Sequence, residues 1–313
     1  MEISTAVIGL GKVGLTYDLD ARGNLLPNQV MTHCRAISLS DFFQIRYLVD
    51  SNLLAIQTAV NHYGGLALNS IQARDSIGPA FVVVSVPTSN HLQVIESIIE
   101  TWNPGTYLIE KPFGRTLNES RKIQELLRNQ DARVYINYFR RYLPNFTSLK
   151  TSSLFQSRGK LLNVTINGYG TLLNIFSHFL DLIIYFESSS ILGTSAKTKF
   201  SVESGSIQFI DPTTEISFEL NGVDQGYLEC EMTLRYENLE IFMISNGKRL
   251  EIRSLDGHTL ETFELDDTTF SSYQSFVLNH IEEEYSPSRK NTSMDDAIRI
   301  HEFLESIELS HAI

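Results

Sequence analysis

Residues 3–14 read Ile-Ser-Thr-Ala-Val-Ile-Gly-Leu-Gly-Lys-Val-Gly, an apolar run that leads directly into a Gly-x-Gly-x-x-Gly turn. A strand followed by such a turn places backbone N–H groups and the start of a helix where a pyrophosphate can bind. Gly9 permits the tight turn, Gly11 leaves room for the phosphate oxygens, and Gly14 lets the next helix pack close to the sheet. Two more residues of the turn are expected to contact the same ligand, Lys12 and Val13. The stretch predicts a dinucleotide site.

The first 139 residues alternate between strand-like and helical patterns. Apolar strand-like runs lie at 3–8, 44–49, 80–86, 106–109 and 133–138. Segments with the apolar spacing of helices separate them, for example at 92–102 and 117–127. This alternation predicts a doubly wound parallel sheet with crossover helices, which is a Rossmann domain at residues 1–139.

The pattern changes after residue 140. Apolar and polar residues alternate at 160–166, 197–202, 215–220, 227–235, 240–245 and 249–253. Hairpin turns are expected at Asn221-Gly222, Asn246-Gly247 and Asp256-Gly257, and helical patterns return at 271–284 and 294–308. Residues 140–313 are therefore expected to form a second α/β domain with an open, mostly antiparallel sheet.

Composition narrows the class of protein. A chain of 313 residues exceeds what one hydrophobic core usually serves, so two domains are expected. Its net charge of −12 opposes binding to nucleic acid. Cys34 and Cys230 form no disulfide framework or metal motif, and none of the eight histidines has a metal-ligand spacing. The apolar segment 171–186 is too short to span a bilayer. We expect a cytoplasmic protein without a metal site.

Asp50 ends the second strand, where a carboxylate can accept hydrogen bonds from an adenosine ribose; a solvated strand end is the alternative. The interval from Gly14 to Asp50 is 36 residues, against the usual roughly 20. An inserted loop at 17–29 near the cofactor, before a helix around 32–39, accounts for the difference. Ser51 and Asn52 provide no arginine for a 2′-phosphate, so NAD is preferred over NADP.

Two further strand ends carry polar residues. The strand at 82–86 runs into Pro87-Thr88-Ser89-Asn90-His91, where the nicotinamide half of the ligand would lie, although His91 could simply open the next helix. The strand at 106–109 ends in Glu110-Lys111-Pro112. Its lysine, fixed by a proline that could be cis, is either functional or part of a surface ion pair.

Helical spacing places three polar residues of the segment 171–186 on one face, Asn174, His178 and Asp181. Burying three polar groups without partners would be costly, so either the histidine is a core residue with its own hydrogen-bond partners or the three residues face a cleft. Histidine suits proton exchange near neutrality, which favours the cleft.

Taken together, the motifs resemble one family. They are Gly9-x-Gly11-x-x-Gly14, Pro87 with His91, Glu110-Lys111-Pro112, Arg140-Arg141-Tyr142-x-Pro144 and Gly168-x-Gly170-x-x-x-Asn174-x-x-x-His178-x-x-Asp181. Their order and spacing are similar to those of the glucose-fructose oxidoreductase/inositol dehydrogenase (Gfo/Idh/MocA) family over nearly the whole chain. The resemblance implies NAD(P)-dependent redox chemistry on a sugar or cyclic polyol, and a homodimer or homotetramer formed through the second sheet.

Carried over residue by residue, the resemblance implies that Lys111 polarises the reacting hydroxyl or carbonyl and that His178 takes the hydroxyl proton. Asn174 stands where the family commonly has an aspartate, and an amide cannot support an imidazolium electrostatically. The implied cofactor contacts are Gly9, Gly11, Lys12, Val13, Gly14, Asp50, Ser51, Pro87, Thr88, His91 and Glu110. The implied substrate contacts are Lys111, Asn137, Arg140, Asn174 and His178. A binding protein that has lost catalysis is the alternative function.

A second departure from the family lies after the strand at 161–166. The chain passes almost straight into the helix, where many members have a longer connection that contacts substrate. The pocket is expected to be more open, or to be closed by the insertion at 17–29.

Overall fold

In a computed structural model the chain forms two compact units, Met1–Phe139 with Ser271–Asp295 and Arg140–Phe270 with Asp296–Ile313. The structure describes residues 2–71, 78–170, 172–188, 191–192, 200–203, 206–210, 216–223, 229–285 and 293–311. The predicted fold class, a Rossmann domain followed by an α/β domain with a largely antiparallel sheet, is confirmed.

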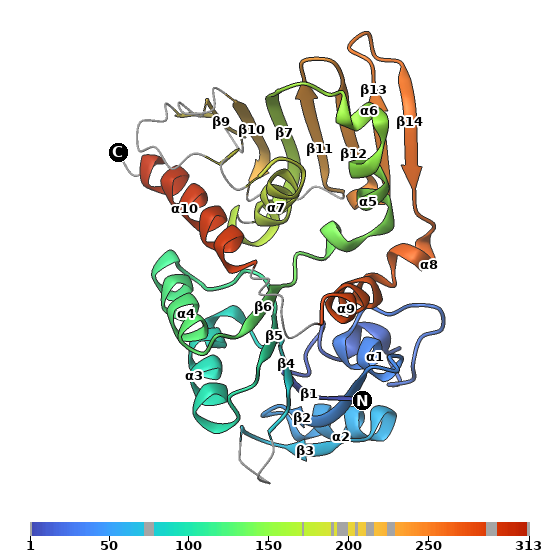
Figure 1. Cartoon of the computed structure of the whole chain (residues 1–313), viewed down its shortest axis with the longest axis vertical. Helices are drawn as coiled ribbons and strands as arrows, with labels where there is room; N and C mark the ends of the chain where they lie inside the picture. Colours follow the sequence, from blue (N-terminus) through green and yellow to red (C-terminus); the bar gives the residue numbers. More distant parts are fainter. Residues whose placement is uncertain are drawn as a thin grey trace. The chain divides into compact units, whose positions relative to one another are not determined.

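The first unit contains the predicted parallel sheet (Figure 1). Its strands are β1 (Ile3–Ile8), β2 (Phe43–Val49), β3 (Leu66–Leu68), β4 (Phe81–Val84), β5 (Thr106–Ile109) and β6 (Arg133–Ile136). They lie in the order β3-β2-β1-β4-β5-β6, and every pairing is parallel. Only β3 has no counterpart among the predicted strands, because three residues are too few to show a periodic pattern.

Helices cover both faces of this sheet. They are α1 (His33–Ser38), α2 (Leu53–Tyr63), α3 (His91–Thr101), α4 (Leu117–Asn129) and α9 (Tyr273–Glu283). In Figure 1, α3 and α4 lie on one side of the sheet and α1, α2 and α9 on the other. Their apolar residues, such as Ile95, Ile98 and Ile123, are buried against strands whose own side chains are almost all buried. The arrangement leaves the carboxyl ends of the strands as the edge where a ligand can bind.

The predicted insertion is present, and it divides a helix. After the glycine turn the chain forms only a short 3₁₀ helix, η1 (Thr16–Asp18), and α1 starts at His33. The amides of His33 and Cys34 donate to the carbonyls of Val13 (3.0 Å) and Gly14 (3.1 Å). These bonds join α1 to the end of the glycine turn, so the loop lies between two parts of what is otherwise one helix.

Asp18 holds the two ends of the insertion together. Its buried carboxylate accepts hydrogen bonds from the amides of Met31 and Thr32, each at 2.9 Å, and from the Thr32 hydroxyl at 2.7 Å. Thr32 is the N-cap of α1, and its hydroxyl also accepts from the Arg35 amide. The insertion is therefore a fixed element that determines where α1 begins.

We expected all of residues 140–313 in the second domain, but Ser271–Asp295 clusters with the first unit. The Val30 amide donates to the Ser271 carbonyl (2.9 Å), and the Tyr273 hydroxyl donates to the Met31 carbonyl (3.0 Å). In α9, Val277 and Ile281 are fully buried. The two residues that follow the insertion thus contact the start of the segment that contains α9, which no pattern within residues 271–295 reveals.

The second unit contains an eight-stranded sheet of order β14-β13-β12-β11-β7-β10-β9-β8. The strands are β7 (Leu161–Gly170), β8 (Phe200–Glu203), β9 (Ser206–Ile210), β10 (Ser217–Val223), β11 (Glu231–Tyr236), β12 (Glu240–Ile244), β13 (Arg249–Arg253) and β14 (Thr259–Glu264). All pairs are antiparallel except the pair of β7 and β10. Parts of the predicted strands at 197–202 and 227–235 lie outside the described residues.

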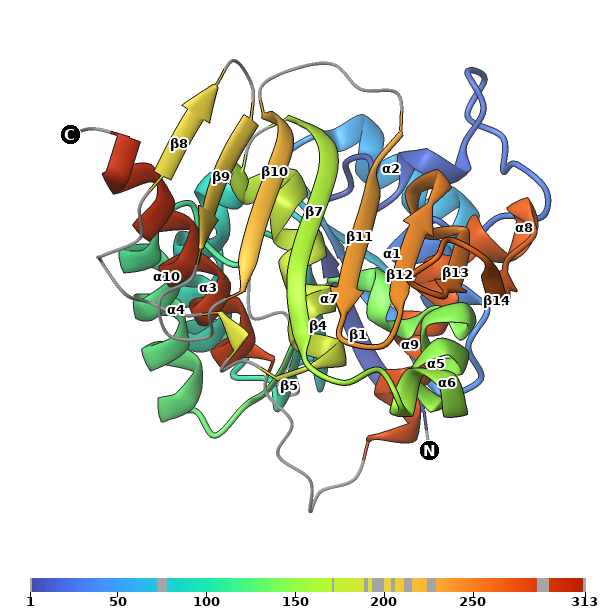
Figure 2. The same cartoon turned by 90° about the horizontal axis from the view of Figure 1, so that it is seen from above.

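Helices lie on one face of this sheet, as Figures 1 and 2 both show. They are α5 (Pro144–Thr151), α6 (Ser153–Gln156), α7 (Ser177–Phe186) and α10 (Met294–His311), while the four-residue α8 (Asp267–Phe270) follows β14. Val164, Ile166 and Leu234 are buried. Among the described residues, no helix combines the length and apolar character that crossing a membrane requires.

Two of the three predicted turns are confirmed, between β12 and β13 and between β13 and β14. The predicted turn at Asn221-Gly222 is wrong, since both residues lie within β10. Asn221 pairs with Ser206 of β9 and Asn167 of β7, and its amide donates to the Asn167 side chain at 3.0 Å. Pairing of Asn221 on both sides keeps the chain extended at this point despite the turn propensity of the dipeptide.

His301 of α10 should make the second unit sensitive to acid. Burial lowers its pKa from 6.5 to about 4. Between pH 6.5 and 4 the unfolded chain therefore binds a proton that the folded chain does not. The contribution of neutral His301 to the free energy of unfolding is complete above pH 6.5 and is lost as the pH falls to 4. The shift corresponds to about 3 kcal/mol. In urea denaturation, His301→Leu should flatten the decline in stability from pH 7 to 4, whereas His258→Leu, at an exposed position, should not. Equal declines in both variants would contradict the assignment.

Candidate functional site

The glycine turn divides into residues that the fold requires and one that it does not. Gly9 has φ +93°, and a Cβ there would lie 2.6 Å from the Ser85 carbonyl carbon. A Cβ at Gly14 would lie 2.0 Å from the Gly9 carbonyl oxygen. A Cβ at exposed Gly11, in contrast, would have no atom within 4 Å. Packing within the protein therefore does not require a glycine at position 11. A phosphate group that approaches the backbone at this position would require one.

The neighbouring strands hold this turn from both sides. Asp50, after β2, accepts from the Leu10 amide at 2.6 Å and from the Asn52 amide at 2.8 Å. Ser85, after β4, donates to the Gly9 carbonyl at 2.7 Å. Asp50 therefore lies beside the glycine turn and shapes it, and its predicted contact with a ribose stays a prediction, as does that of exposed Ser51. Lys12 is exposed within the same turn.

His91 has a different role from the predicted cofactor contact. It is the first residue of α3 and is fully buried, while Pro87 is exposed and Thr88 begins the 3₁₀ helix η2 (Thr88–Asn90). Its Nδ1 lies 3.2 Å from the Phe113 carbonyl oxygen and its Nε2 3.1 Å from that of Val86. Burial lowers its pKa, although the two carbonyls oppose this shift. The predicted contact of His91 with the cofactor is therefore wrong, because a buried ring whose two nitrogens both face backbone carbonyls cannot reach a ligand.

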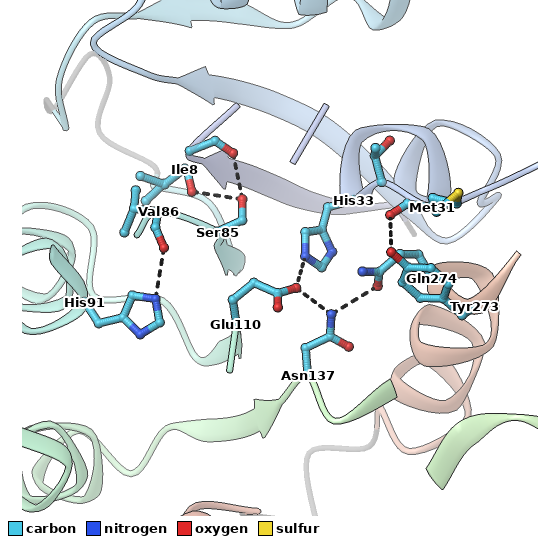
Figure 3. Close-up of polar contacts among 12 residues, drawn as sticks. Ile8, Met31, His33, Ser85, Val86, His91, Glu110, Asn137, Tyr273 and Gln274 are labelled. Carbon is cyan, nitrogen blue, oxygen red and sulfur yellow. Dashed lines mark hydrogen bonds and ion pairs between the residues drawn. The ribbon is translucent and has the colours of Figure 1, made fainter. Parts of the chain in front are cut away.

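The Lys111–Pro112 peptide bond is cis, and Glu110 immediately before it is part of a polar cluster (Figure 3). Glu110 Oε1 lies 2.8 Å from His33 Nε2 and accepts from Asn137 Nδ2 at 2.5 Å. Burial acts to raise the pKa of Glu110, but the hydrogen bonds from His33 and Asn137 and the charges of His33 and Lys111 outweigh it and lower the pKa. Glu110 is thus held ionised next to Lys111.

The same cluster extends to α9. Asn137 Nδ2 also points to Gln274 Oε1, at 3.4 Å, and both residues are at least 98% buried. Among the described residues, Asn137 Oδ1 and Gln274 Nε2 have no hydrogen-bond partner. Asn137 was predicted as a substrate contact, and the structure places it as a support for the Glu110 carboxylate. His33 and Gln274 were not predicted, because each is far from Glu110 in sequence.

In the second unit the predicted helix at 171–186 is not uniform. Residues Leu172–Phe176 form a π-helix, η4, and α7 follows at Ser177. A π-turn contains more residues than an α-turn, so a four-residue spacing does not stack two side chains there as it does in an α-helix. Asn174 is accordingly exposed, whereas His178 is buried to 93%. The expectation that both share one face with Asp181 is corrected, and Thr171 lies outside the described residues.

Asp181 has a structural partner. Its carboxylate accepts from Arg141 Nε at 2.9 Å and from Arg141 Nη2, and Asp296 lies 3.4 Å from the same guanidinium. Burial raises the pKa of Asp181, and the guanidinium opposes that shift. The bidentate pair uses both carboxylate oxygens. Asp181 is therefore engaged with Arg141 and does not take the place of the aspartate that Asn174 replaces.

Arg140 lies beside α7. Its guanidinium carbon is 5.5 Å from the ring centroid of Phe179, and its Nε donates to the Asn246 carbonyl at 3.2 Å. The structure thus places Arg140 next to α7, the helix that carries His178, and their predicted contacts with a substrate stay predictions. Within the described part of the chain, no group of His, Cys, Asp or Glu side chains could hold a metal ion.

Residues 3–138 match the profile of a family described as an oxidoreductase family with an NAD-binding Rossmann fold. The match confirms the predicted class of cofactor. Comparison with curated proteins gives no match.

Three solved structures illustrate the likeness in fold. The WlbA dehydrogenase from Bordetella pertussis, in complex with NADH and UDP-GlcNAcA, superposes with TM-score 0.71 and 14% identity, over 99% of this chain and 96% of that chain. A dehydrogenase (MviM) from Clostridium difficile has TM-score 0.71 and 14% identity, over 100% of both chains. The super-repressor mutant of Gal80p from Saccharomyces cerevisiae has TM-score 0.73 and 14% identity, over 100% and 97%. At such identities the similarity shows a common fold.

Proposed function

Because the Rossmann unit of this chain belongs to the Gfo/Idh/MocA oxidoreductase family, we propose that the protein is an NAD(P)-dependent oxidoreductase. Its substrate is a sugar, a sugar derivative or a cyclic polyol, and the reacting carbon bears a hydroxyl or carbonyl group. The observation that carries the proposal is the carboxyl edge of the Rossmann sheet. There the glycine turn with its open Gly11 and the fixed, ionised Glu110 beside Lys111 lie on strands of one sheet.

The roles of two residues follow from their chemistry. Bound nicotinamide supplies or accepts the hydride. The Lys111 ammonium holds the substrate oxygen and stabilises negative charge that develops on it. His178 takes the hydroxyl proton in oxidation and returns it in reduction. Arg140 and Asn174 bind substrate hydroxyl groups. The UDP-GlcNAcA bound to WlbA supports a sugar derivative as the substrate class.

Cofactor contacts are proposed from the turn and the strand ends. The amides around Gly11 hold the pyrophosphate, and Lys12 adds a positive charge beside it. Asp50 accepts from the adenosine ribose, and its carboxylate, without an arginine at Ser51 or Asn52, disfavours a 2′-phosphate. We therefore propose NAD as the preferred cofactor, with NADP as the weaker one.

Gly11→Ala tests the site directly. The new Cβ meets no protein atom within 4 Å, so the fold and its stability should stay unchanged, while NADH affinity should fall at least roughly tenfold because the methyl group occupies phosphate space. Gly105→Ala is the matched control, since its Cβ is equally unobstructed but lies just before β5, at the opposite edge of the sheet. Calorimetry with NADH measures both variants. Equal affinity in the two variants would contradict the proposed site, and no NADH binding by the wild type would refute the function.

The alternative function is a dinucleotide-binding sensor or regulator without catalysis. Asn174 favours it, because the neutral amide leaves the His178 imidazolium without the carboxylate that the family commonly supplies. The fold shared with Gal80p, solved as a super-repressor mutant, is compatible with it. A wild-type protein that binds NADH but transfers no hydride to any of a panel of sugars, sugar derivatives and polyols would select this alternative.

We also propose that the protein is cytoplasmic and forms a homodimer or homotetramer through the sheet of the second unit. Opposite positions of adjacent strands there carry Thr165, Thr233 and Phe242, none of which is buried. Arg253 covers the Phe242 ring at 3.9 Å. Light scattering after gel filtration measures the oligomeric state, and Phe242→Glu should dissociate the oligomer.

A further inference from the structure

Lys111 lies in a short segment that is held on both sides by buried histidines. The segment follows β5, and the Glu110 amide donates to the Val84 carbonyl of β4 at 2.9 Å. On one side of Lys111 is the Glu110 carboxylate, and on the other is the Phe113 carbonyl. Each of these groups faces the imidazole of a different helix, His33 of α1 or His91 of α3.

On the Glu110 side, two side chains hold the same carboxylate oxygen. His33 Nε2 and Asn137 Nδ2 both reach Glu110 Oε1, so the carboxylate is attached to α1 and to the end of β6 at once. His33 is 2% exposed and lies directly after Thr32, which Asp18 holds through two hydrogen bonds, to the amide and to the hydroxyl of Thr32. Asp18 therefore fixes the residue that precedes His33, and Figure 3 shows the His33 ring directed at the Glu110 carboxylate.

The contact on the Phe113 side has the same character. The His91 ring is fully buried between the Phe113 and Val86 carbonyl oxygens, 3.2 Å and 3.1 Å from its two nitrogens. A neutral imidazole carries one N–H and donates to one of these oxygens. We take Nδ1 as the protonated nitrogen, so that the ring donates to the Phe113 carbonyl of the segment after β5. The Phe113 side chain is itself fully buried. Movement of Phe113 would therefore break a hydrogen bond and open a cavity.

We propose that His33, acting through Glu110, and His91, acting through the Phe113 carbonyl, are positioning residues that fix the place of Lys111. The proposal rests on the function proposed for Lys111 above. Neither histidine needs to touch substrate or cofactor. A misplacement of about 1 Å of a group that orients substrate can cost roughly a hundredfold in rate, which is why such supports matter.

Four variants test the proposal. His33→Leu and His91→Leu remove the imidazoles, and His33→Gln restores a side-chain N–H that can reach Glu110. His62→Leu is the matched control. His62 lies on α2, and its Nε2 is 2.8 Å from the carbonyl oxygen of Gly23 in the insertion, so it makes the same kind of contact with a segment other than that of Lys111. His33 and His91 lie on different helices. If one of the two leucine variants does not fold, the other still tests whether a histidine positions Lys111.

The first measurement needs no substrate. Lysines are labelled by reductive ¹³C-methylation, and the Lys111 resonance is identified by its absence in Lys111→Arg. We expect this resonance to shift in His33→Leu and His91→Leu, to return in His33→Gln, and to stay unchanged in His62→Leu.

The second measurement compares kcat with the Kd of NADH. In the two leucine variants kcat should fall about 10- to 100-fold, while the Kd stays within about twofold of wild type.

A Lys111 resonance and a kcat that match the His62→Leu control in both leucine variants would overturn the proposal. Its failure is distinguishable from failure of the proposed function. If the wild type binds NADH but transfers no hydride, the function is refuted, whereas a resonance shift restricted to His33→Leu and His91→Leu still supports the positioning of Lys111.

Discussion

Replacement of Lys111 by methionine should lower kcat for hydride transfer by about 10²–10³ and leave NADH binding close to that of the wild type. Methionine keeps the length of the side chain and removes the ammonium that stabilises charge on the substrate oxygen. Removal of one such charged donor from an active site typically has an effect of this size. NADH consumption with an active sugar substrate gives kcat, and fluorescence titration gives the affinity.

Lys122→Met is the control for this prediction. Lys122 is exposed on α4, on the same unit, and the substitution changes the net charge by the same amount. It should leave both kcat and NADH affinity unchanged. Turnover by Lys111→Met that equals turnover by Lys122→Met would remove Lys111 from the reaction.

Gly14→Ala should destabilise the first unit by about 3 kcal/mol or more. The new Cβ would lie 2.0 Å from the Gly9 carbonyl oxygen and 3.1 Å from Ser85 Oγ. The Gly9 oxygen is backbone, and it accepts the Ser85 hydrogen bond that holds the turn, so it cannot move without distorting the site. Urea denaturation followed by circular dichroism measures the loss.

Gly11→Ala, three residues away in the same turn, separates packing from ligand binding. It should retain wild-type stability and lose NADH affinity, whereas Gly14→Ala should lose stability first. A Gly14→Ala protein within about 1 kcal/mol of the wild type would mean that the close packing around Gly9 is not a requirement of the fold.

Local sequence patterns predicted the sheet of the first unit well. The runs that became β1, β2, β4, β5 and β6 are apolar and bounded by turn residues, and both of these are properties of neighbouring residues. The interval from Gly14 to Asp50 predicted an insertion because a chain that must return to the next strand leaves few alternatives for the extra residues. The cis bond before Pro112 was also foreseen as an option.

Patterns failed where a second segment changed the outcome. Asn221-Gly222 has strong turn propensity, but β9 and β7 pair with Asn221 from both sides. The spacing of Asn174 and His178 indicated one helical face, but the π-turn at Leu172–Phe176 places them differently. His91 occupies a ligand-facing position in the pattern, and only the burial of its ring by the segment after β5 shows that it supports that segment.

The sequence by itself determined the Rossmann sheet, the glycine turn and the identity of Lys111 as the residue at the end of β5, because strand periodicity and backbone space are encoded by adjacent residues. Only the tertiary structure decided which side chains surround the Glu110 carboxylate next to Lys111. His33, Asn137 and Gln274 reach the Glu110 cluster from segments far apart along the chain. Their contacts arise when helices and strands pack against one another, and such contacts leave no periodic signal in any one segment.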